Sequence, residues 1–142
     1  MAATAPRLLI INCASPYFFY IPMGVFGLCD YLGQRGVQTR IFSPSLYPEA
    51  GMGERLLAVL EDVRPTHVGL ACHWQETAHG LVDALAVVRQ WSGEVVTIGG
   101  GFTAAFFGED LLQTLDGLDY VVTGDAELPL WQLLQGRDPL SI

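Results

Sequence analysis

Charged residues are scarce in this sequence, and most of them are acidic. Only 15% of its 142 residues are charged, against about 25% in soluble domains, and the formal net charge is -8. An acidic chain without a cluster of basic residues does not attract phosphate backbones or anionic lipids. We therefore expect no nucleic acid and no membrane among its partners.

Long hydrophobic runs are also missing, although 51% of the residues are hydrophobic. No run approaches the roughly 18 residues that span a bilayer, and the run at residues 8–11 is too short for a signal peptide. So large an apolar share excludes intrinsic disorder, because its burial offsets the entropy of ordering the chain. The sequence predicts one domain whose surface is partly covered by a partner or a neighbouring domain.

Cysteine is rare and widely spaced. Cys13, Cys29 and Cys72 form neither a C-x-x-C pair nor the cysteine triad of an iron–sulfur motif. Three isolated thiols are typical of a reducing compartment, so we expect a cytoplasmic protein. We assign no residue of this chain a catalytic role and none a role in binding metal.

Short apolar runs alternate with segments of helical periodicity. Strands are expected at residues 8–11, 37–42, 66–72, 94–98 and 119–123, and helices at residues 23–35, 55–63, 78–91, 104–115 and 126–134. The first strand is apolar throughout, which is typical of burial on both faces, whereas the second is more polar, as edge strands are. Gly36 is expected to close the first helix in the left-handed conformation.

This alternation predicts an α/β fold in which right-handed crossovers connect parallel strands. Five strands favour a flavodoxin-like (Rossmann-like) doubly wound sheet of order 2-1-3-4-5 with helices on both faces. In such sheets, ligands bind beyond the carboxyl ends of the strands. The loops that follow the strands are therefore the candidate site.

The loop after the first strand, residues 14–22, is aromatic and uncharged, although loops usually face water. Either its aromatic residues line a cavity or contact a large flat ligand, or Phe18 and Phe19 pack back onto the core. Both interpretations stay open.

The loop after the third strand carries Cys72, His73, Trp74 and Gln75. His73 is either a base or metal ligand, or a histidine that is merely hydrogen-bonded within its loop. His67, inside a strand, and His79, in the first turn of a helix, are expected to be structural.

The loop after the fourth strand contains three glycines, followed by Phe102 and Thr103. Glycines allow a ligand to approach the backbone closely, and the helix that follows offers free amide groups to a phosphate or an amide-rich ligand. Gly99-x-Gly101-x-x-Ala104 also loosely matches a dinucleotide fingerprint, with Asp125 as a candidate ribose-binding acid. A nucleotide-binding oxidoreductase domain that uses the Gly99–Gly101 turn is therefore the main alternative function.

The loop after the fifth strand reads Gly124-Asp125-Ala126-Glu127. Asp125 can cap the last helix and Glu127 can favour its positive end, so capping alone explains this pair. A third function, a signalling module of the receiver type, is disfavoured because the first strand ends at Asn12-Cys13-Ala14, without an acidic cluster.

Residues 66–134 include "THVGLACHWQETAHGL", "VVTIGGGFTA" and "DYVVTGDAELPLWQLL". In their order and spacing they resemble the cobalamin-binding domain at the N-terminus of cobalamin-dependent radical S-adenosylmethionine enzymes, and a looser resemblance extends over residues 7–135. That family has a Gly-Gly turn after the fourth strand, here Gly99-Gly100. It has a G-E-G-E-like turn after the fifth, from which residues 124–127 depart at two positions.

The resemblance implies that cobalamin (vitamin B12) is the cofactor, held at the carboxyl ends of the strands. The residues that we expect to contact it are Ser15, Pro16, Tyr17, Phe18, Cys72, His73, Trp74, Gln75, Gly99, Gly100, Gly101, Phe102, Thr103, Gly124 and Glu127. Methionine-synthase-like domains supply a cobalt-ligating histidine after the first strand, but residues 12–24 contain none. We therefore expect no histidine of this chain to coordinate cobalt.

The resemblance also implies a division of labour. Residues 1–135 would form the cobalamin-binding domain, and residues 136–142, which begin with Gly-Arg-Asp-Pro, a linker toward a missing catalytic domain. S-adenosylmethionine and a [4Fe-4S] cluster would belong only to that radical S-adenosylmethionine domain, a partner in cis or in trans. The chain alone would hold cobalamin for a radical enzyme, a methyltransferase in our interpretation, and catalyse nothing itself.

Overall fold

Five parallel strands form one sheet in the order β2-β1-β3-β4-β5. The computed structural model describes residues 5–13, 15, 20–47 and 51–137. The strands are β1 (Arg7–Asn12), β2 (Gln38–Phe42), β3 (His67–Ala71), β4 (Val96–Gly100) and β5 (Tyr120–Val121). The predicted flavodoxin-like order is confirmed, and the polar second strand lies at an edge, as expected.

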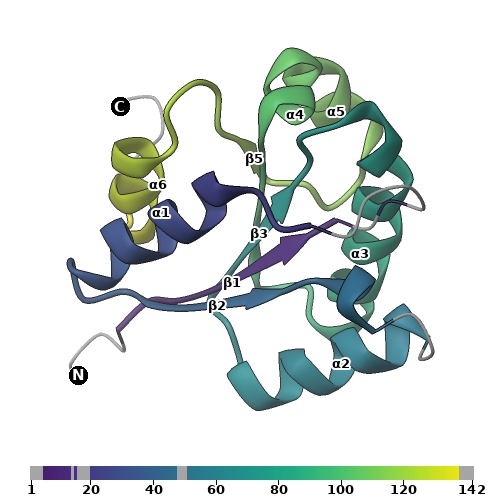
Figure 1. Ribbon diagram of the computed structural model, residues 1–142, viewed down its shortest axis with the longest axis horizontal. Helices are drawn as coiled ribbons and strands as arrows, with labels where there is room; N and C mark the ends of the chain where they lie inside the picture. The colour runs from purple at the N-terminus through teal and green to yellow at the C-terminus, as the bar shows by residue number, and fades with distance from the viewer. Residues whose placement is uncertain (1–4, 14, 16–19, 48–50, 138–142) are drawn as a thin grey trace.

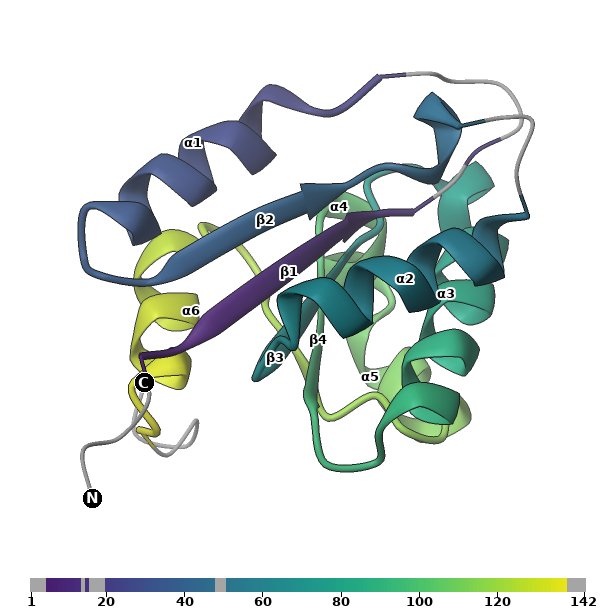
Figure 2. The same ribbon diagram turned by 90° about the horizontal axis from the view of Figure 1, so that it is seen from below.

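Helices cover both faces of the sheet. They are α1 (Met23–Gly33), α2 (Met52–Val63), α3 (Ala78–Trp91), α4 (Phe102–Phe106), α5 (Gly108–Thr114) and α6 (Glu127–Leu134), with short 3-10 helices η1 (Pro44–Leu46) and η2 (Gln75–Thr77). Helices α1 and α6 lie side by side on one face, and α2 and α3 pack together on the other (Figures 1 and 2). None of the described helices is long and apolar enough to cross a membrane.

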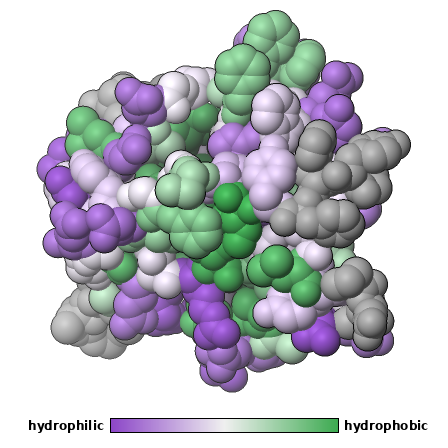
Figure 3. All heavy atoms as spheres, in the orientation of Figure 1, coloured by the Kyte–Doolittle hydropathy of each residue, from purple (hydrophilic) through white to green (hydrophobic). Residues whose placement is uncertain are grey.

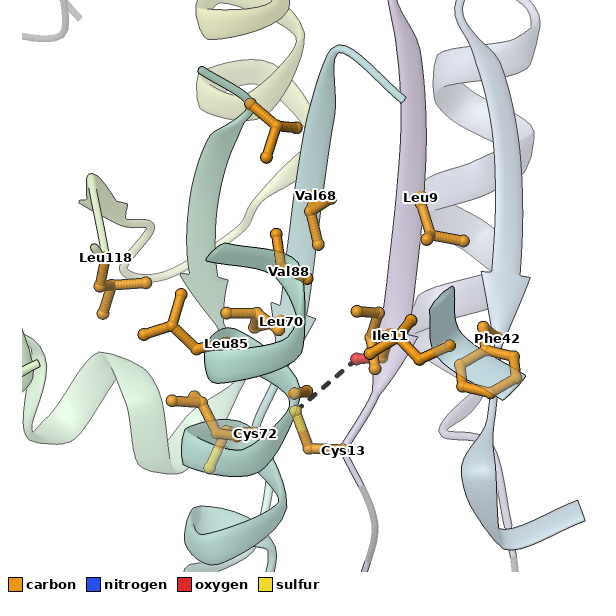
Figure 4. Close-up of a cluster of buried hydrophobic side chains, with 14 of the residues drawn as sticks. Leu9, Ile11, Cys13, Phe42, Val68, Leu70, Cys72, Leu85, Val88 and Leu118 are labelled. Atoms are coloured by element: carbon orange, nitrogen blue, oxygen red, sulfur yellow. Dashed lines mark hydrogen bonds between the residues drawn. The ribbon is translucent and has the colours of Figure 1, made fainter. Parts of the chain in front are cut away.

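Alternation along the central strands divides the core into two layers. Leu9 and Ile11 of β1, with Val68 and Leu70 of β3, point toward α2 and α3 and are almost completely buried (Figure 4). Leu8 and Ile10 point toward α1 and α6 instead. Each buried side chain of this size contributes about 1.5–3 kcal/mol to folding, so both layers hold the sheet in place.

The first helix ends at Gly33, two residues before the predicted end, with Gln34 as its C-cap, but Gly36 takes the left-handed conformation that the sequence predicts. Gly36 has a φ of +83°, and the N–H of Val37 donates to the carbonyl of Leu32 at 3.1 Å. A glycine takes this left-handed conformation without steric cost. The chain therefore turns sharply from α1 into β2.

The helix predicted at residues 104–115 is wrong in its continuity. Phe107 leaves the helical conformation, with φ −106° and ψ 21°, and separates α4 from α5. The start of α5 lies close to β5, because a Cβ on Gly108 would lie 3.1 Å from Cγ1 of Val121. Periodicity does not reveal this contact between α5 and β5, since it arises only in the folded chain.

The short strand β5 is held by side chains at its amino end. Thr97, which is fully buried, receives a hydrogen bond from Nη2 of Arg89 at 2.9 Å. Asp119 accepts from the same nitrogen at 2.7 Å and from the N–H of Thr97 at 2.8 Å. Nε of Arg89 also donates to the carbonyl of Gly117 at 2.8 Å. Charge-assisted bonds of this kind are the stronger class, and they reinforce an edge where only two residues are in strand conformation.

Candidate functional site

A cavity of about 330 Å³ lies between the sheet and the helices α1 and α6. We call it the slot. Its volume falls at the lower end of the range for small-molecule sites. The described residues that line it are Ile10, Gly24, Val25, Leu28, Gly69, Leu70, Ala71, His73, Ile98, Gly99, Gly100, Gly101, Val122, Gly124, Asp125, Ala126, Glu127 and Leu130.

The slot exists because small residues occupy one face of two central strands. Gly69 and Ala71 of β3 alternate with Val68 and Leu70, which point to the opposite face. Gly100, at the end of β4, is in register with Ala71. A Cβ on Gly100 would have no atom within 4 Å, so this glycine leaves open space where other residues would place a side chain.

The slot reaches from the carboxyl edge about halfway down the sheet. Ile98 lies two residues before Gly100 on β4, and Gly69 two residues before Ala71 on β3, a distance of about 7 Å along a strand. Val25 and Leu28 of α1 form one wall, and Leu130 of α6 lines the slot on the other side. The inner half is therefore lined by strands on one side and by two helices on the other.

The mouth of the slot is polar. His73, Asp125 and Glu127 line it there, beyond the ends of β3 and β5. Burial lowers the pKa of His73, so its imidazole is neutral at pH 7. The capping role considered for Asp125 is wrong: Ala126 is the N-cap of α6, and no side chain caps that helix. Asp125 lines the mouth of the slot instead.

Gly101 has a different role from Gly100. Its φ is +99°, and a Cβ there would lie 2.7 Å from the carbonyl oxygen of Cys72. The N–H of Cys72 donates to the carbonyl of Gly100 at 2.8 Å, and the N–H of Ala104 donates to the carbonyl of Cys72 at 3.2 Å. Gly99 and Gly100 belong to β4, since they pair with Leu70 and Ala71. The predicted three-glycine turn is therefore reduced to Gly101 alone.

Two expected contact residues point their side chains elsewhere. Cys72 is packed in the layer under α3, where Oγ1 of Thr77 donates to its sulfur at 3.3 Å. Burial raises the pKa of the Cys72 thiol, so it is not a reactive thiolate at pH 7. Oγ1 of Thr103 donates to the carbonyl of His73 at 2.9 Å. These two side chains hold the loops in position and do not reach into the slot.

The carboxyl edge around the slot carries exposed aromatic rings. Nε1 of Trp74 donates a hydrogen bond to the hydroxyl of Tyr20, which joins the first and third loops. Phe102 is 78% exposed at the start of α4. Hydrophobic residues lie on the surface at the top of the view, where α4 is located (Figures 1 and 3). Ser15 is buried, and Gln75 is exposed and lines a groove between α3 and α5 instead of the slot.

Pro16, Tyr17 and Phe18, which we also expected to contact cobalamin, lie outside the described residues.

The inner wall of the slot was not predicted from the sequence. The signal was available at one position, because a lone glycine inside a strand, such as Gly69, often marks close backbone approach by a ligand. The described residues contain no group of three or more histidine, cysteine, aspartate or glutamate side chains that could hold a metal ion.

The fold is a doubly wound α/β domain with a cavity at the carboxyl edge of its sheet. A family model, the B12 binding domain, matches residues 9–134. The chain therefore belongs to the B12-binding domain family. No curated protein matches it in sequence.

Two solved structures of one enzyme share the fold over nearly all of this chain. The TsrM radical S-adenosylmethionine methyltransferase from Kitasatospora setae, with cobalamin and a [4Fe-4S] cluster bound, superposes with a TM-score of 0.83 at 18% identity. The match covers 95% of this chain and 26% of that chain. The same enzyme with a tryptophan substrate and a SAM analogue gives 0.80 at 18%, covering 94% and 27%. The chain thus spans about a quarter of the length of these enzymes.

Receiver domains share the general fold more distantly. The pseudo-receiver domain of the CikA protein superposes with a TM-score of 0.54 at 15% identity and covers 94% of this chain and 100% of that chain. The receiver domain of a response regulator from Methanoculleus marisnigri JR1 gives 0.51 at 12%, covering 92% and 94%. These likenesses show the sheet order alone, since function lies in sites grafted onto a fold.

Proposed function

We propose that this chain binds cobalamin and that the slot takes the nucleotide tail of the cofactor. The open Cβ direction of Gly100 is the observation that carries the proposal. Together with Gly69 and Ala71 it keeps a strip of backbone clear beneath α1 and α6. Protein cores are otherwise close-packed, so this open strip favours a bound ligand. The long, narrow nucleotide tail of cobalamin fits such a space.

The residues around the mouth have distinct tasks in this proposal. Gly124, with a φ of +72°, turns the chain away from the mouth, and no atom lies within 4 Å of a Cβ built on it. Glu127 and Asp125 present acceptors to hydroxyl or amide hydrogens. Trp74 and Phe102 would offer exposed apolar area to the broad, largely apolar corrin ring. The bound cofactor would supply a methyl group to a reaction partner.

The experiment exchanges glycine for valine at two open positions. Gly100→Val fills the slot and should abolish binding of hydroxocobalamin, measured by absorbance after gel filtration. The fold should persist, because no atom lies within 4 Å of the new Cβ. Gly93→Val is the matched control: Gly93 also has open space around its Cβ position and lies before β4, at the opposite edge of the sheet. Unchanged binding in Gly100→Val would show that the slot is not the tail site.

The alternative function, a dinucleotide-binding oxidoreductase domain, can be tested by calorimetry. Our proposal predicts that cobalamin binds and that NAD and flavin give no heat, whereas the alternative predicts the reverse. Gly99 and Gly100 are strand residues, so only Gly101 remains in the turn, and this disfavours the dinucleotide fingerprint. Micromolar binding of a dinucleotide with no response to cobalamin would favour the oxidoreductase over the cobalamin-binding function.

We further propose that the chain serves as the cofactor domain of a radical S-adenosylmethionine methyltransferase, in cis or in trans. The support is the overlap with about a quarter of such an enzyme and the aromatic edge, where Phe102 and Phe106 are 78% and 77% exposed. S-adenosylmethionine and the [4Fe-4S] cluster would reside in the other domain. Addition of the cobalamin-loaded chain to a radical S-adenosylmethionine domain without its own B12-binding domain should restore methyl transfer. No rescue, with the complex formed, would contradict this role.

A further inference from the structure

The polar side chains of the slot are confined to its mouth. Among the described residues that line the slot, His73, Asp125 and Glu127 alone have polar side chains. All three lie beyond the carboxyl ends of the strands, in the loop after β3 and around the start of α6. They therefore meet the part of a ligand that stays near the surface.

The inner half of the slot is apolar. Its lining includes Ile10, Ile98, Val25, Leu28 and Leu130. The strand backbone that forms its floor offers no free group, because a residue between two parallel neighbours has both its N–H and its C=O in the ladders. Gly69 is such a residue, in register with Ile10 on one side and Ile98 on the other. A ligand end that reaches this depth meets methyl and methylene groups among the described residues.

We propose that the slot selects corrinoids by the base at the end of the nucleotide tail: it accepts apolar 5,6-dimethylbenzimidazole and rejects a purine. This inference rests on the proposed function, because it requires the tail to enter the slot. Dimethylbenzimidazole carries C–H and methyl groups along its outer edge, and their burial is favourable. Adenine carries an amino group and ring nitrogens there, and these lose water without finding a hydrogen-bond partner.

The test compares three corrinoids on the full chain: cobalamin, the analogue with adenine as the base, and cobinamide, which lacks the nucleotide tail. Dissociation constants come from the quenching of tryptophan fluorescence. We expect cobalamin to bind at least about tenfold more tightly than the adenine analogue, and cobinamide to bind more weakly than cobalamin. Equal binding of cobalamin and the adenine analogue would overturn the selectivity and leave the proposed function standing. Binding of none of the three would overturn both.

Two variants locate the selection in the slot. Gly69→Ala adds a methyl group to the floor, where its Cβ would lie 3.6 Å from Cγ1 of Ile10, an ordinary contact. It should weaken cobalamin severalfold and leave cobinamide unchanged. Leu28→Gln brings a donor and an acceptor into the wall and should reduce the preference for cobalamin severalfold. Leu112→Gln, at an exposed position on α5, is the control. A change of the same size in the control would overturn the assignment to the slot.

Discussion

The two faces of the central sheet are built by the same strands but are packed differently. Toward α2 and α3, β3 presents Val68 and Leu70, which are 0% and 1% exposed (Figure 4). Toward α1 and α6, the same strand presents Gly69 and Ala71, and the slot lies above them. Because successive side chains on a strand point to opposite faces, one strand can fill a core and open a binding site at the same time.

This division separates stability from binding. Filling the layer under α2 and α3 with leucine and valine supplies folding free energy through burial. The opposite layer gives up part of that burial at Gly69 and Gly100 and gains space for a ligand. A ligand that binds only the folded state restores stability, and the gain grows with the logarithm of its concentration above the dissociation constant. Substitutions on the two faces should therefore have opposite signatures in unfolding and binding measurements.

The largest effect is expected from a truncation in the filled layer. Leu9 is 0% exposed and packs in the layer under α2 and α3, so Leu9→Ala should lower the free energy of unfolding by about 2–5 kcal/mol. The neighbouring Ile10→Ala, on the slot face, should cost less, because Ile10 already borders a cavity. Urea denaturation measures both. A greater loss for Ile10→Ala would contradict the contrast between the faces.

An intermediate effect on stability is expected at the end of β4, where Gly100 borders the slot and Gly101 contacts the backbone of Cys72. Gly101→Ala places a Cβ 2.7 Å from the carbonyl oxygen of Cys72 in a left-handed conformation, and such strain costs about 1–3 kcal/mol. Gly100→Ala is the matched change one residue away, with open space around the new methyl group, and its stability should change by less than about 1 kcal/mol. Thermal denaturation of both variants checks the pair. Equal losses would mean that Gly100 is structural as well.

The sheet order was predictable because alternating strands and helices indicate a parallel sheet, and five strands with a polar second strand favour the order 2-1-3-4-5. The apolar first strand and the polar second strand placed β1 in the interior and β2 at an edge. The carboxyl edge followed from the parallel order, and with it the position of Gly100 and Glu127 at the slot.

The inner walls of the slot were not predictable in the same way. Val25, Leu28 and Leu130 belong to the apolar stripes of two helices far apart in sequence. Their periodicity shows that they face the sheet, but only the packing of α1 against α6 decides whether they meet or leave a gap. The direction of the Cys72 side chain was not predicted for a related reason: the residue follows the strand, and its side chain packs in the layer under α2 and α3.

The smallest effect on the free energy of unfolding is expected from two histidines on the slot face of the sheet, which is the face toward α1 and α6 and is called the open face below. His67 shares its face of β3 with Gly69, and His73 lies at the mouth of the slot. Burial lowers the pKa of both, so the unfolded chain binds protons more readily than the folded one. The free energy of unfolding should therefore decrease as the pH falls below the ordinary histidine pKa of 6.5. The double variant His67→Gln, His73→Gln should weaken this dependence, measured as the shift of the urea midpoint between about pH 7.5 and about pH 5.5. His79→Gln, at an exposed position on α3, is the control and should retain the wild-type shift. A double variant with the full wild-type shift would mean that the acid sensitivity arises outside the open face.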